Sequence, residues 1–476
     1  MLPPPFLVIG DEVHEAGARL RVEDRSTGEH LSDVVTATHA QAEDAVVVAE
    51  KAFEASRALS GAARRRILRN IGRGLVEHRD RLARIICAEA GKPISLAKAE
   101  VDRAIVTVGL ASEETTRHKG EVLALDISDA TAMYSGHHVR VPRGPVLGIT
   151  PFNFPLNLVA HKLAPAIACG ASLVLKPAPQ TPLTALVLAE IVRASGGPPG
   201  LFTVLPCEND VAERLVRDDR LRTLAFTGSA EVGWRLKAIA GKKHVVLELG
   251  GNAAAIVHED APSLALAAQL VCGSAFNYAG QVCIKTQRVY VHRPIAERFM
   301  SEIVQRASLY APQDPRDELA TMGPMVSEAH AERVEAWVGE ALEAGAVPLV
   351  AGRREGSRMP AIVLRIDGAG KGLAVVDEEV FGPVLTVHVY DTWIDALRLA
   401  GDTRYGLQAS VFTDSVSRVR EAFAKLAVGT LVVNDAASVR VDSMPYGGTR
   451  DSGMGREGVR WAMEEMSEVK AMVVRG

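Results

Sequence analysis

Three side chains in the sequence have the types required for nucleophilic catalysis: a thiol, a carboxylate and an amide. Cys283 closes the segment GQVC, in which Gly280 permits a tight turn, so its thiol is a candidate nucleophile. Free cysteines are also among the most buried residues of proteins, and an inert core position is the alternative. The other four cysteines lack even this context.

Glu248 and Asn153 are the candidate partners of this thiol. Glu248 lies in LELGG after an apolar run, and the carboxyl edge of a parallel sheet faces the ligand crevice. Burial there would raise the pKa of its carboxyl group, which suits a general base; the alternative is a carboxylate bonded to amides of the Gly-Gly turn. Asn153 lies in the stiff turn PFNFP, so its amide could donate to an oxyanion or could form an Asx-turn.

Two glycine-rich segments are candidate phosphate or loop sites. The segment FTGSAEVG, residues 226–233, follows a predicted strand and leads into a helix beginning near Ala230. Gly228 and Ser229 at that helix N-terminus could bind a phosphate, because free amide groups and the helix dipole converge there. The segment is no P-loop, since no Gly-Lys-Ser/Thr follows. GGTRDSGMG, residues 447–455, has no clear strand before it and alone indicates a loop.

The elements that must position these groups follow from hydrophobic spacing. Thr38 and Gln41 form a capping-box pattern that starts a helix, and residues 62–90 continue in helical style. Short apolar runs then alternate with helical or loop stretches, which is typical of a doubly wound parallel sheet. The runs are Val146–Thr150, Ser172–Leu175, Leu201–Leu205, Thr223–Phe226 and Val245–Leu249.

A second α/β region follows the first. Residues 121–141 and the tail 467–474 are each read as a candidate hairpin that contacts another subunit. The expected strands of the second region are Ala253–Val257, Val289–Val291, Leu373–Val376, Val384–Tyr390, Ser410–Thr413 and Leu431–Val433.

Composition limits the class of protein. The 476 residues allow about three domains, and 47% hydrophobic with 24% charged residues is ordinary for a globular chain. Lys plus Arg number 54 and Asp plus Glu 58, so the net charge of −4 invites neither nucleic acid nor an anionic membrane. Five cysteines without CxxC spacing predict no disulfide framework and no metal site, and they indicate a reducing, cytoplasmic location.

The sequence also disfavours export of the protein and its insertion into a membrane. The N-terminal residues show no secretory signal pattern. The uncharged run 261–284 is long enough to span a bilayer, but it opens near Pro262 and carries several polar side chains, so we expect a buried segment of the fold.

Taken together, these segments resemble the aldehyde dehydrogenase superfamily from about residue 30 to the C-terminus. The order of the motifs makes the resemblance specific, because several matches in one order are very hard to obtain by chance. It is greatest with NAD(P)-dependent members that act on small, often polar aldehydes, such as lactaldehyde and succinate-semialdehyde dehydrogenases. The motifs are PFNFP at 151, LVLKPAPQTP at 173, FTGS at 226, LELGG at 247, GQVC at 280, EEVFGPV at 378 and PYGGTRDSGMGRE at 445.

The resemblance implies a fold and a division into domains. It implies an α/β protein with a Rossmann-like doubly wound parallel sheet, a second α/β catalytic domain and a small β oligomerisation flap. Pairing both hairpin edges with a neighbour would remove exposed strand edges, so we expect a homodimer or homotetramer. The expected parts are an NAD(P)-binding domain of residues 1–120 and 142–250, a catalytic domain of 251–440, and a flap and tail of 121–141 and 441–476.

The resemblance also implies the catalytic roles. Cys283 would add to the aldehyde carbonyl, and the Asn153 amide with the Cys283 backbone N–H would hold the oxyanion of the thiohemiacetal. After hydride transfer to the nicotinamide, Glu248 would activate the water that hydrolyses the thioester to the acid. Lys162 and Glu457 match positions that support water ordering or proton transfer. The product would be a carboxylate and the reduced cofactor.

For the cofactor, the resemblance places Lys176 and Glu379 at the two riboses, Phe381 near the nicotinamide and Ser229 at the pyrophosphate. Many NAD-preferring members carry a Glu three residues after this Lys, where Pro179 stands here. Losing that carboxylate removes a penalty against the 2′-phosphate without adding a cation, so we expect dual use with a lean to NADP. The expected cofactor positions also include Gly228, Gly233 and Leu249.

Four further residues bear on the substrate. Lys285 departs from the small residue usual in the family; its ammonium could lower the thiol pKa or attract an anionic substrate, and the alternative is that it points away into a salt bridge near the interface. Arg103, His161 and Arg440 lie in stretches that line the substrate tunnel in relatives. A basic mouth that favours a carboxylated or sulfonated aldehyde is therefore a hypothesis.

Two other functions stay open from the sequence. The thiol and carboxylate could serve a cysteine-dependent esterase, which would need no nicotinamide cofactor. A non-catalytic structural relative is the other alternative, although such a chain has no physical need for Cys283, Glu248 and Asn153 together.

Overall fold

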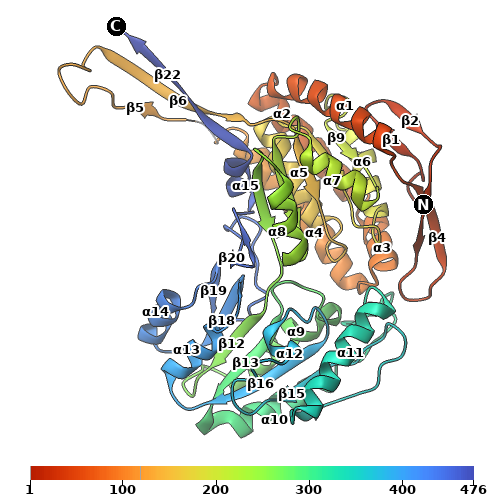
Figure 1. Cartoon of the computed structure of the whole chain (residues 1–476), viewed down its shortest axis with the longest axis vertical. Helices are drawn as coiled ribbons and strands as arrows, with labels where there is room; N and C mark the ends of the chain where they lie inside the picture. The colour runs from red at the N-terminus through yellow and green to blue at the C-terminus, as the bar shows by residue number, and fades with distance from the viewer. Residues whose placement is uncertain (1, 118–119) are drawn as a thin grey trace.

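The computed structural model describes the chain except residues 1 and 118–119. Two parallel sheets with their helices lie one beyond the other along the long axis of the molecule, and a narrow β ribbon projects from one end (Figure 1). The α/β class and the doubly wound first sheet that the sequence predicted are confirmed.

The first sheet has six strands in the order β21-β11-β10-β7-β8-β9. All neighbours pair in parallel except β21, which runs antiparallel along β11. Each of the five predicted apolar runs forms a strand of this sheet. The strands are β7 (Val146–Ile149), β8 (Leu173–Lys176), β9 (Phe202–Val204), β10 (Thr223–Thr227), β11 (His244–Glu248) and β21 (Gly453–Met454).

The connection order of this sheet creates a crevice. From β7 the chain winds outward to β8 and β9, then returns to the other side of β7 to form β10 and β11. Strand order therefore reverses between β7 and β10, and such a switch point is where α/β sheets bind ligands beyond the carboxyl ends of their strands. The PFNFP turn follows β7, and Gly228 and Ser229 follow β10, so both motifs lie at this crevice.

Helices cover both faces of the first sheet because its strands are apolar on both faces. In β8, Leu173 and Leu175 pack on one side and Val174 on the other, as the alternation of a strand requires. One face carries α1 (His39–Arg57), α7 (Asn209–Arg217) and α8 (Ala230–Ile239). The other carries α2 (Gly61–Glu77), α3 (Arg79–Ala90), α4 (Ile94–Glu114), α5 (Asn157–Cys169), α6 (Leu183–Arg193) and α15 (Val459–Glu465).

The second sheet has seven strands in the order β14-β15-β16-β13-β12-β18-β19, parallel except for β14 with β15. Its strands are β12 (Ala253–Val257), β13 (Thr286–His292), β14 (Val347–Val350), β15 (Ile362–Arg365), β16 (Val384–Tyr390), β18 (Gln408–Phe412) and β19 (Thr430–Val433). One face packs against α9 (Leu264–Phe276), α10 (Ala296–Ala307), α11 (Glu328–Glu343) and α12 (Ala374–Asp377). The other packs against α13 (Trp393–Gly401) and α14 (Val416–Lys425).

Short elements complete the chain. The capping box predicted at Thr38 is present: its hydroxyl accepts the Gln41 N–H, and the Gln41 side chain accepts the Thr38 N–H. The remaining strands and 3-10 helices are β1 (Leu7–Ile9), β2 (Glu12–His14), β3 (Arg19–Glu23), β4 (His30–Val35), β17 (Tyr405–Gly406), β20 (Thr449–Arg450), η1 (Asn277–Gly280) and η2 (Arg293–Ile295).

Two expectations about strands are wrong. The expected strand 373–376 is instead the N-cap and first residues of helix α12 (Ala374–Asp377), since four apolar residues in a row cannot distinguish a short helix from a strand. The tail is not a hairpin but one long strand, β22 (Ser467–Arg475), which pairs antiparallel with β6 (Tyr134–Pro142). With β5 (Val122–Leu123) they form the three-stranded ribbon that projects from the body in Figure 1.

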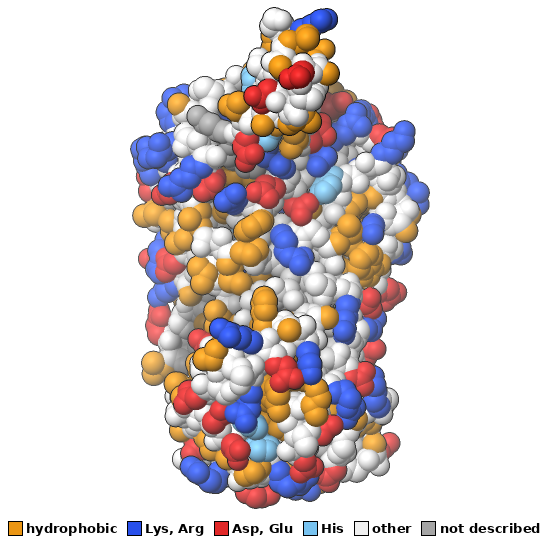
Figure 2. Space-filling view, turned by 90° about the vertical axis from the view of Figure 1, so that its left-hand side faces the viewer, with side chains coloured by type: hydrophobic (Ala, Val, Ile, Leu, Met, Phe, Trp, Pro, Cys, Tyr) orange, Lys and Arg blue, Asp and Glu red, His pale blue; other side chains and the backbone are white. Residues whose placement is uncertain are grey.

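The projecting ribbon exposes apolar side chains. Val469, Met472 and Val473 of β22 are each more than half exposed, as is Val122 of β5. Figure 2 shows hydrophobic side chains on this projection among charged ones. By contrast, the uncharged run 261–284 forms α9 and its flanking loops, most of which are buried in the second sheet's core. None of the described helices combines the length and apolarity that crossing a bilayer requires.

A buried ion pair joins the two halves of the molecule near the crevice. Lys92 and Glu100 pair with almost no exposure, and Glu100 also accepts the Leu156 and Asn157 N–H groups at 2.9 and 3.1 Å, which caps α5. The Lys92 ammonium lies 3.7 Å from the ring centroid of Phe154, after β7, and 4.7 Å from that of Tyr278, in η1. One cation therefore contacts the loops that carry Asn153 and Cys283.

We expect Lys92→Met to lower the free energy of unfolding by about 3 kcal/mol, because Glu100 would keep a buried charge without its cation. Lys98→Met is the matched control: its ammonium pairs with Glu318 at the surface, so its loss should cost less than about 1 kcal/mol. Denaturant unfolding of the two variants measures the difference. Equal denaturant midpoints for Lys92→Met and Lys98→Met would show that burial of the Lys92–Glu100 pair has no effect on the free energy of unfolding.

Candidate active site

A cavity of about 520 Å³ opens between the two sheets. Cys283, Asn153 and Glu248 all line it, although they come from three segments far apart in the sequence. Asn153 follows β7, Glu248 ends β11, and Cys283 precedes β13, so the carboxyl edge of the first sheet meets the amino edge of the second here. The three groups proposed for catalysis thus share one cavity.

The loop that precedes Cys283 is held in an unusual backbone conformation. Tyr278, Ala279 and Gly280 have positive φ angles of 54°, 52° and 65°. Only glycine adopts this region freely, so the two preceding residues are strained, and such strain is typical of functional loops. At Gly280 a Cβ would also lie 2.3 Å from the Gly382 carbonyl oxygen. The glycine that the sequence marked as a turn residue is required by both conformation and space.

Cys283 is half-buried and faces the cavity. Burial raises the pKa of its thiol to about 11, while a hydrogen bond with Tyr446 acts in the opposite direction. The Sγ and the Tyr446 hydroxyl are 3.1 Å apart. The inert-core alternative does not apply to this cysteine; by contrast, the other four, Cys87, Cys169, Cys207 and Cys272, are buried.

Close backbone contact fixes Cys283 against the end of β11. A Cβ on Gly251 would lie 2.4 Å from the Cys283 carbonyl oxygen, so the second glycine of LELGG lets the two segments touch. A Cβ on Gly250 would lie 2.2 Å from a carboxylate oxygen of Glu379. Gly250 and Gly251 therefore allow the Glu379 carboxylate and the Cys283 backbone to pack closely against the end of β11.

Asn153 is buried and bonds across the cavity rather than to its own turn. Its Nδ2 donates to the Gln281 carbonyl at 2.9 Å, two residues before the nucleophile. The Asx-turn alternative does not hold, because that turn requires Asn153 Oδ1 to accept a nearby backbone N–H, and this buried oxygen has no hydrogen-bond partner among the described residues. An amide nitrogen carries two N–H bonds, and the second remains for another acceptor.

Glu248 has no hydrogen-bond partner for either carboxylate oxygen among the described residues, although it is 3% exposed. The alternative of a carboxylate bonded to the Gly-Gly amides therefore does not hold. Burial, and next the nearby carboxylate of Glu457, raise the pKa of Glu248 well above its usual range. A buried, unpaired carboxylate in a cavity is suited to take up a proton.

Glu457 is the paired counterpart of Glu248. It accepts from Lys162 Nζ at 2.7 Å with one oxygen and from Arg440 Nη2 at 3.1 Å with the other. Burial acts to raise the pKa of Glu457, but Lys162 and Arg440 outweigh it and hold the value at about 2. Lys162 also donates to the Thr227 hydroxyl at 2.7 Å. Lys162 and Glu457 lie behind the cavity wall rather than on it.

A second groove of about 370 Å³ continues from the cavity over the first sheet. The two share the residues after β7 and β10, including Pro151, Phe152, Gly228 and Ser229. Lys176 and Pro179 line the far part, and Leu249 lines the cavity. Gly233 lines neither; a Cβ there would lie 2.4 Å from Leu249, so this glycine lets α8 pack closely on the end of β11.

The residues along this groove suit a dinucleotide. Ser229 is the N-cap of α8 but its side chain makes no capping bond, so the first-turn N–H groups are available to a phosphate. Lys176 is 7% exposed, and no carboxylate forms an ion pair with it among the described residues. Burial lowers the pKa of this ammonium. The buried ammonium of Lys176, which has no ion-pair partner among the described residues, suits contact with a ribose. The uncapped start of α8 suits a pyrophosphate.

Glu379 and Phe381 lie at the junction of groove and cavity. The Glu379 carboxylate accepts the Gly251 N–H at 3.0 Å, and burial raises its pKa to about 7. Phe381 has a positive φ of 46° and its ring meets Phe152 edge-on, with 5.9 Å between the centroids. Both proposed nicotinamide-side residues are thus close to the Cys283 loop.

The proposed substrate residues divide into two groups. Arg103 and Arg440 line the cavity, while His161 and Lys285 do not. His161 is fully buried and bonds Asp442 at 2.9 Å; burial, and next Arg440, lower its pKa to about 4. Lys285 is buried too and donates to the Val384 carbonyl at 2.7 Å.

Lys285 points away from the cavity, as the alternative held, so its expected action on the thiol or the substrate needs correction, and so does the expected salt bridge. It neither lines the cavity nor forms a salt bridge among the described residues, because its side chain turns into the second sheet. Burial lowers the pKa of this ammonium to about 7. The expectation that His161 lines the tunnel is corrected in the same way, since Asp442 holds the imidazole behind the wall.

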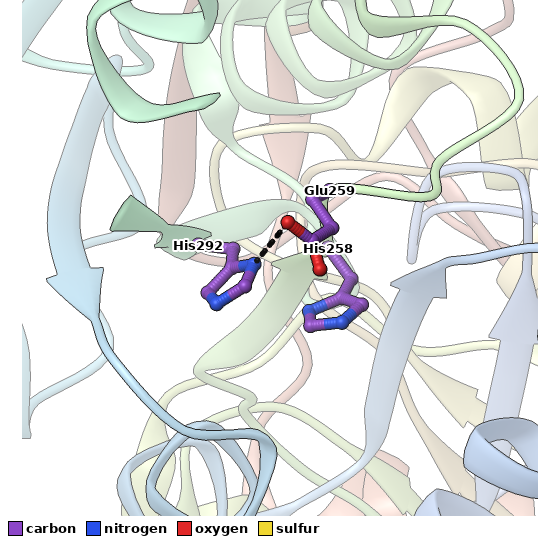
Figure 3. A group of neighbouring side chains, drawn as sticks. All are labelled: His258, Glu259 and His292. Atoms are coloured by element: carbon purple, nitrogen blue, oxygen red, sulfur yellow. Dashed lines mark ion pairs between the residues drawn. The ribbon is translucent and has the colours of Figure 1, made fainter. Parts of the chain in front are cut away.

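A cluster outside the cavity contains metal-ligand types. His258 follows β12, His292 ends β13, and the Glu259 carboxylate lies 3.7 Å from His292 Nδ1 (Figure 3). The two imidazoles stack with 4.3 Å between centroids and 21° between planes. Because a metal binds in the plane of an imidazole, nearly parallel rings cannot both direct lone pairs to one ion. The ligand types are present, but this arrangement does not converge.

Two site residues were not singled out from the sequence. Tyr446 reaches Cys283, and the only signal was its place in the PYGG motif. Asp442 accepts from both Arg103 and His161, at 2.6 and 2.9 Å, and nothing in the local sequence marks it.

Comparison with known proteins agrees with this geometry. Residues 13–472 match the aldehyde dehydrogenase family. The chain is 38% identical over 470 residues to 3-sulfolactaldehyde dehydrogenase of Priestia aryabhattai, covering 98% of this chain and 97% of that protein.

Solved structures show the same fold. Aldehyde dehydrogenase 21 of Physcomitrella patens, solved with the reaction product succinate, aligns with a TM-score of 0.96 at 37% identity over 100% of this chain and 99% of that one. Glyceraldehyde-3-phosphate dehydrogenase of Methanocaldococcus jannaschii, solved with NADP, aligns at 0.92 and 34% over 96% and 99%. The chain belongs to the aldehyde dehydrogenase family and is an oxidoreductase.

Proposed function

We propose that the protein oxidises a small anionic or polar aldehyde to its carboxylic acid with NAD(P), through a cysteine thiohemiacetal and thioester. The observation that carries the proposal is the convergence of Cys283, Asn153 and the unpartnered Glu248 on one cavity that continues into the dinucleotide-sized groove. A thiol, an amide donor and a free carboxylate are the three groups that acyl chemistry on sulfur requires.

Each protein group has a defined task in this reaction. The Cys283 thiolate adds to the carbonyl carbon, and the carbonyl oxygen becomes an oxyanion that accepts from the free N–H of Asn153 and the Cys283 backbone N–H. The chemistry that a bound nicotinamide supplies is acceptance of the hydride from this carbon. Glu248 then takes a proton from water, whose oxygen attacks the thioester carbon as the C–S bond breaks.

The two alternative functions are disfavoured by particular observations. An esterase would not need the groove beyond Phe152, with its uncapped helix start and with Lys176, which has no ion pair within the described part of the chain. A structural relative would not need Glu248 buried without a partner, since an unsatisfied buried carboxylate destabilises the fold.

Two substitutions separate the steps. Cys283→Ser should abolish aldehyde oxidation, because a serine hydroxyl has no comparable ionised fraction. Glu248→Gln should lower kcat by roughly 10²- to 10⁴-fold by removing the base, while the first turnover still releases about one reduced cofactor per site. Rapid-mixing absorbance of the reduced cofactor measures both effects. Full oxidation by Cys283→Ser would overturn the thioester route.

We further propose dual cofactor use with a lean to NADP. Beside Lys176 the groove wall contains Pro179 and Gln180, so no carboxylate stands at the position three residues after this lysine. The groove is also lined by Glu213, which pairs with Arg235, and no carboxylate forms an ion pair with Lys176 among the described residues. Arg235 lines the same wall but pairs with Glu213, so only part of its charge remains for a 2′-phosphate. The solved relative from Methanocaldococcus jannaschii was crystallised with NADP, which supports the lean.

Pro179→Glu should shift the preference toward NAD by at least about tenfold in the ratio of kcat/KM values, because a carboxylate repels the 2′-phosphate and bonds the ribose hydroxyl. The wild-type and variant proteins are compared with NAD and NADP at equal concentration. A strict NAD preference in the wild-type protein would show that Pro179 does not report on the cofactor.

The substrate class follows from the two arginines of the cavity. Arg103 pairs with Asp442 and Arg440 with Glu457, yet Arg440 Nε is buried without a partner among the described residues. An anionic oxygen on the substrate would satisfy that N–H. Sulfolactaldehyde, succinate and glyceraldehyde-3-phosphate, from the relatives' names, each carry a sulfonate, carboxylate or phosphate on a short chain.

Arg440→Gln should lower the kcat/KM ratio of succinate semialdehyde to butanal by about tenfold, since only the first aldehyde carries a carboxylate. Taking a ratio removes any effect of the change on chemistry common to both substrates. Arg79→Gln is the control, because this arginine pairs with Asp102 outside the cavity. An unchanged ratio would exclude Arg440 from substrate recognition.

Assembly and location complete the proposal. The ribbon of β5, β6 and β22 has an open edge and exposed apolar side chains, which supports a homodimer or homotetramer. Five free cysteines support a reducing, cytoplasmic setting.

A further inference from the structure

We propose that Tyr446 is a catalytic residue of this enzyme, which donates a hydrogen bond from its phenol to the thiolate of Cys283 before the aldehyde is attacked. The inference rests on the proposed function, because it assigns a role in forming the nucleophile. Tyr446 lines the same cavity and its hydroxyl is 3.1 Å from Cys283 Sγ.

Backbone hydrogen bonds fix the position of Tyr446 and therefore of its hydroxyl group. The Tyr446 N–H donates to the Glu457 carbonyl at 3.0 Å, and the Glu457 N–H donates to the Tyr446 carbonyl at 2.7 Å. This two-way bridge ties Tyr446 to the residue that holds Lys162 and Arg440. The ring is 3% exposed, so it has little freedom to turn away from the sulfur.

The direction of the hydrogen bond follows from the charges nearby. Burial, and next the neighbouring Cys283, raise the pKa of Tyr446 well above its usual range, so the phenol keeps its proton. The Arg440 guanidinium lies 3.7 Å from the ring centroid and polarises the phenol toward stronger donation. A phenol that keeps its proton can only donate to a thiolate, which has no proton to give.

The Cys283 thiolate needs this hydrogen-bond donor because its surroundings disfavour the negative charge on sulfur. Burial is the main effect that raises the pKa of the Cys283 thiol, and the carboxylates of Glu379 and Glu248 add to it, while Arg440 opposes them. Tyr446 is the hydrogen-bond partner of Sγ among the described residues. Without it, the thiolate would have only the longer-range field of Arg440.

Alkylation by iodoacetamide tests this without aldehyde or cofactor. Tyr446→Phe keeps the ring and removes the donor, so we expect the thiol pKa to rise by roughly one unit and the rate at pH 8 to fall about tenfold. Mass spectrometry locates the label, and Cys283→Ser gives the background from other cysteines. Tyr390→Phe is the matched control, since it removes a buried hydroxyl that bonds His258 at 2.7 Å, far from the cavity.

A second substitution works in the opposite direction. Replacing Tyr446 with 3,5-difluorotyrosine makes the phenol a stronger donor, so alkylation at pH 8 should become faster than in the wild-type protein. Equal alkylation rates and equal thiol pKa values for the wild-type protein and Tyr446→Phe would overturn the proposal. Failure of the proposed function looks different: Cys283→Ser would then still oxidise aldehydes, whatever the alkylation rates show.

Discussion

The active site depends on one constraint, which is that a single buried carboxylate holds two cations. Glu457 accepts from Lys162 and Arg440, and these three groups come from α5 and from two separate segments of the C-terminal region. Neither cation forms an ion pair or hydrogen bond with the second carboxylate, Glu248, whose two oxygens have no hydrogen-bond partner among the described residues. Burial, and next the charge of Glu457, raise the pKa of Glu248, whereas Lys162 and Arg440 outweigh burial at Glu457 and lower its pKa. Two neighbouring carboxylates therefore differ in their affinity for a proton.

This constraint also explains why the two sheets must meet so closely. The carboxyl edge of the first sheet supplies Glu248 and the amino edge of the second supplies Cys283, so the backbones must nearly touch. Gly250 and Gly251 permit that approach, since a Cβ at either position would collide with Glu379 or with the Cys283 carbonyl. The LELGG motif is therefore a packing requirement as much as a catalytic one.

The sequence predicted what depends on local pattern and missed what depends on distant partners. The five parallel strands of the first sheet follow from apolar runs, and the helix at Thr38 from its capping box. The sixth strand, β21, lies in the segment 447–455 that the sequence indicated as a loop. The thiol, carboxylate and amide could be proposed because each follows a strand or a glycine. The directions of Lys285 and His161 could not, since Val384 and Asp442, which hold them, lie about 100 and 281 residues away.

The loop that precedes Cys283 shows how distant contacts fix the backbone at the active site. Left-handed φ angles at Tyr278 and Ala279 cost of order 1 kcal/mol each and persist only if neighbouring structure imposes them. Here the Lys92 ammonium contacts the ring of Tyr278, whose hydroxyl also donates to Ala90 at 3.1 Å. Since Glu100 holds Lys92 and also caps the helix after Asn153, the same ion pair contacts the loop that carries Cys283 and the loop that carries Asn153. The loop is thus ordered by the fold itself, and binding energy need not be spent on arranging it.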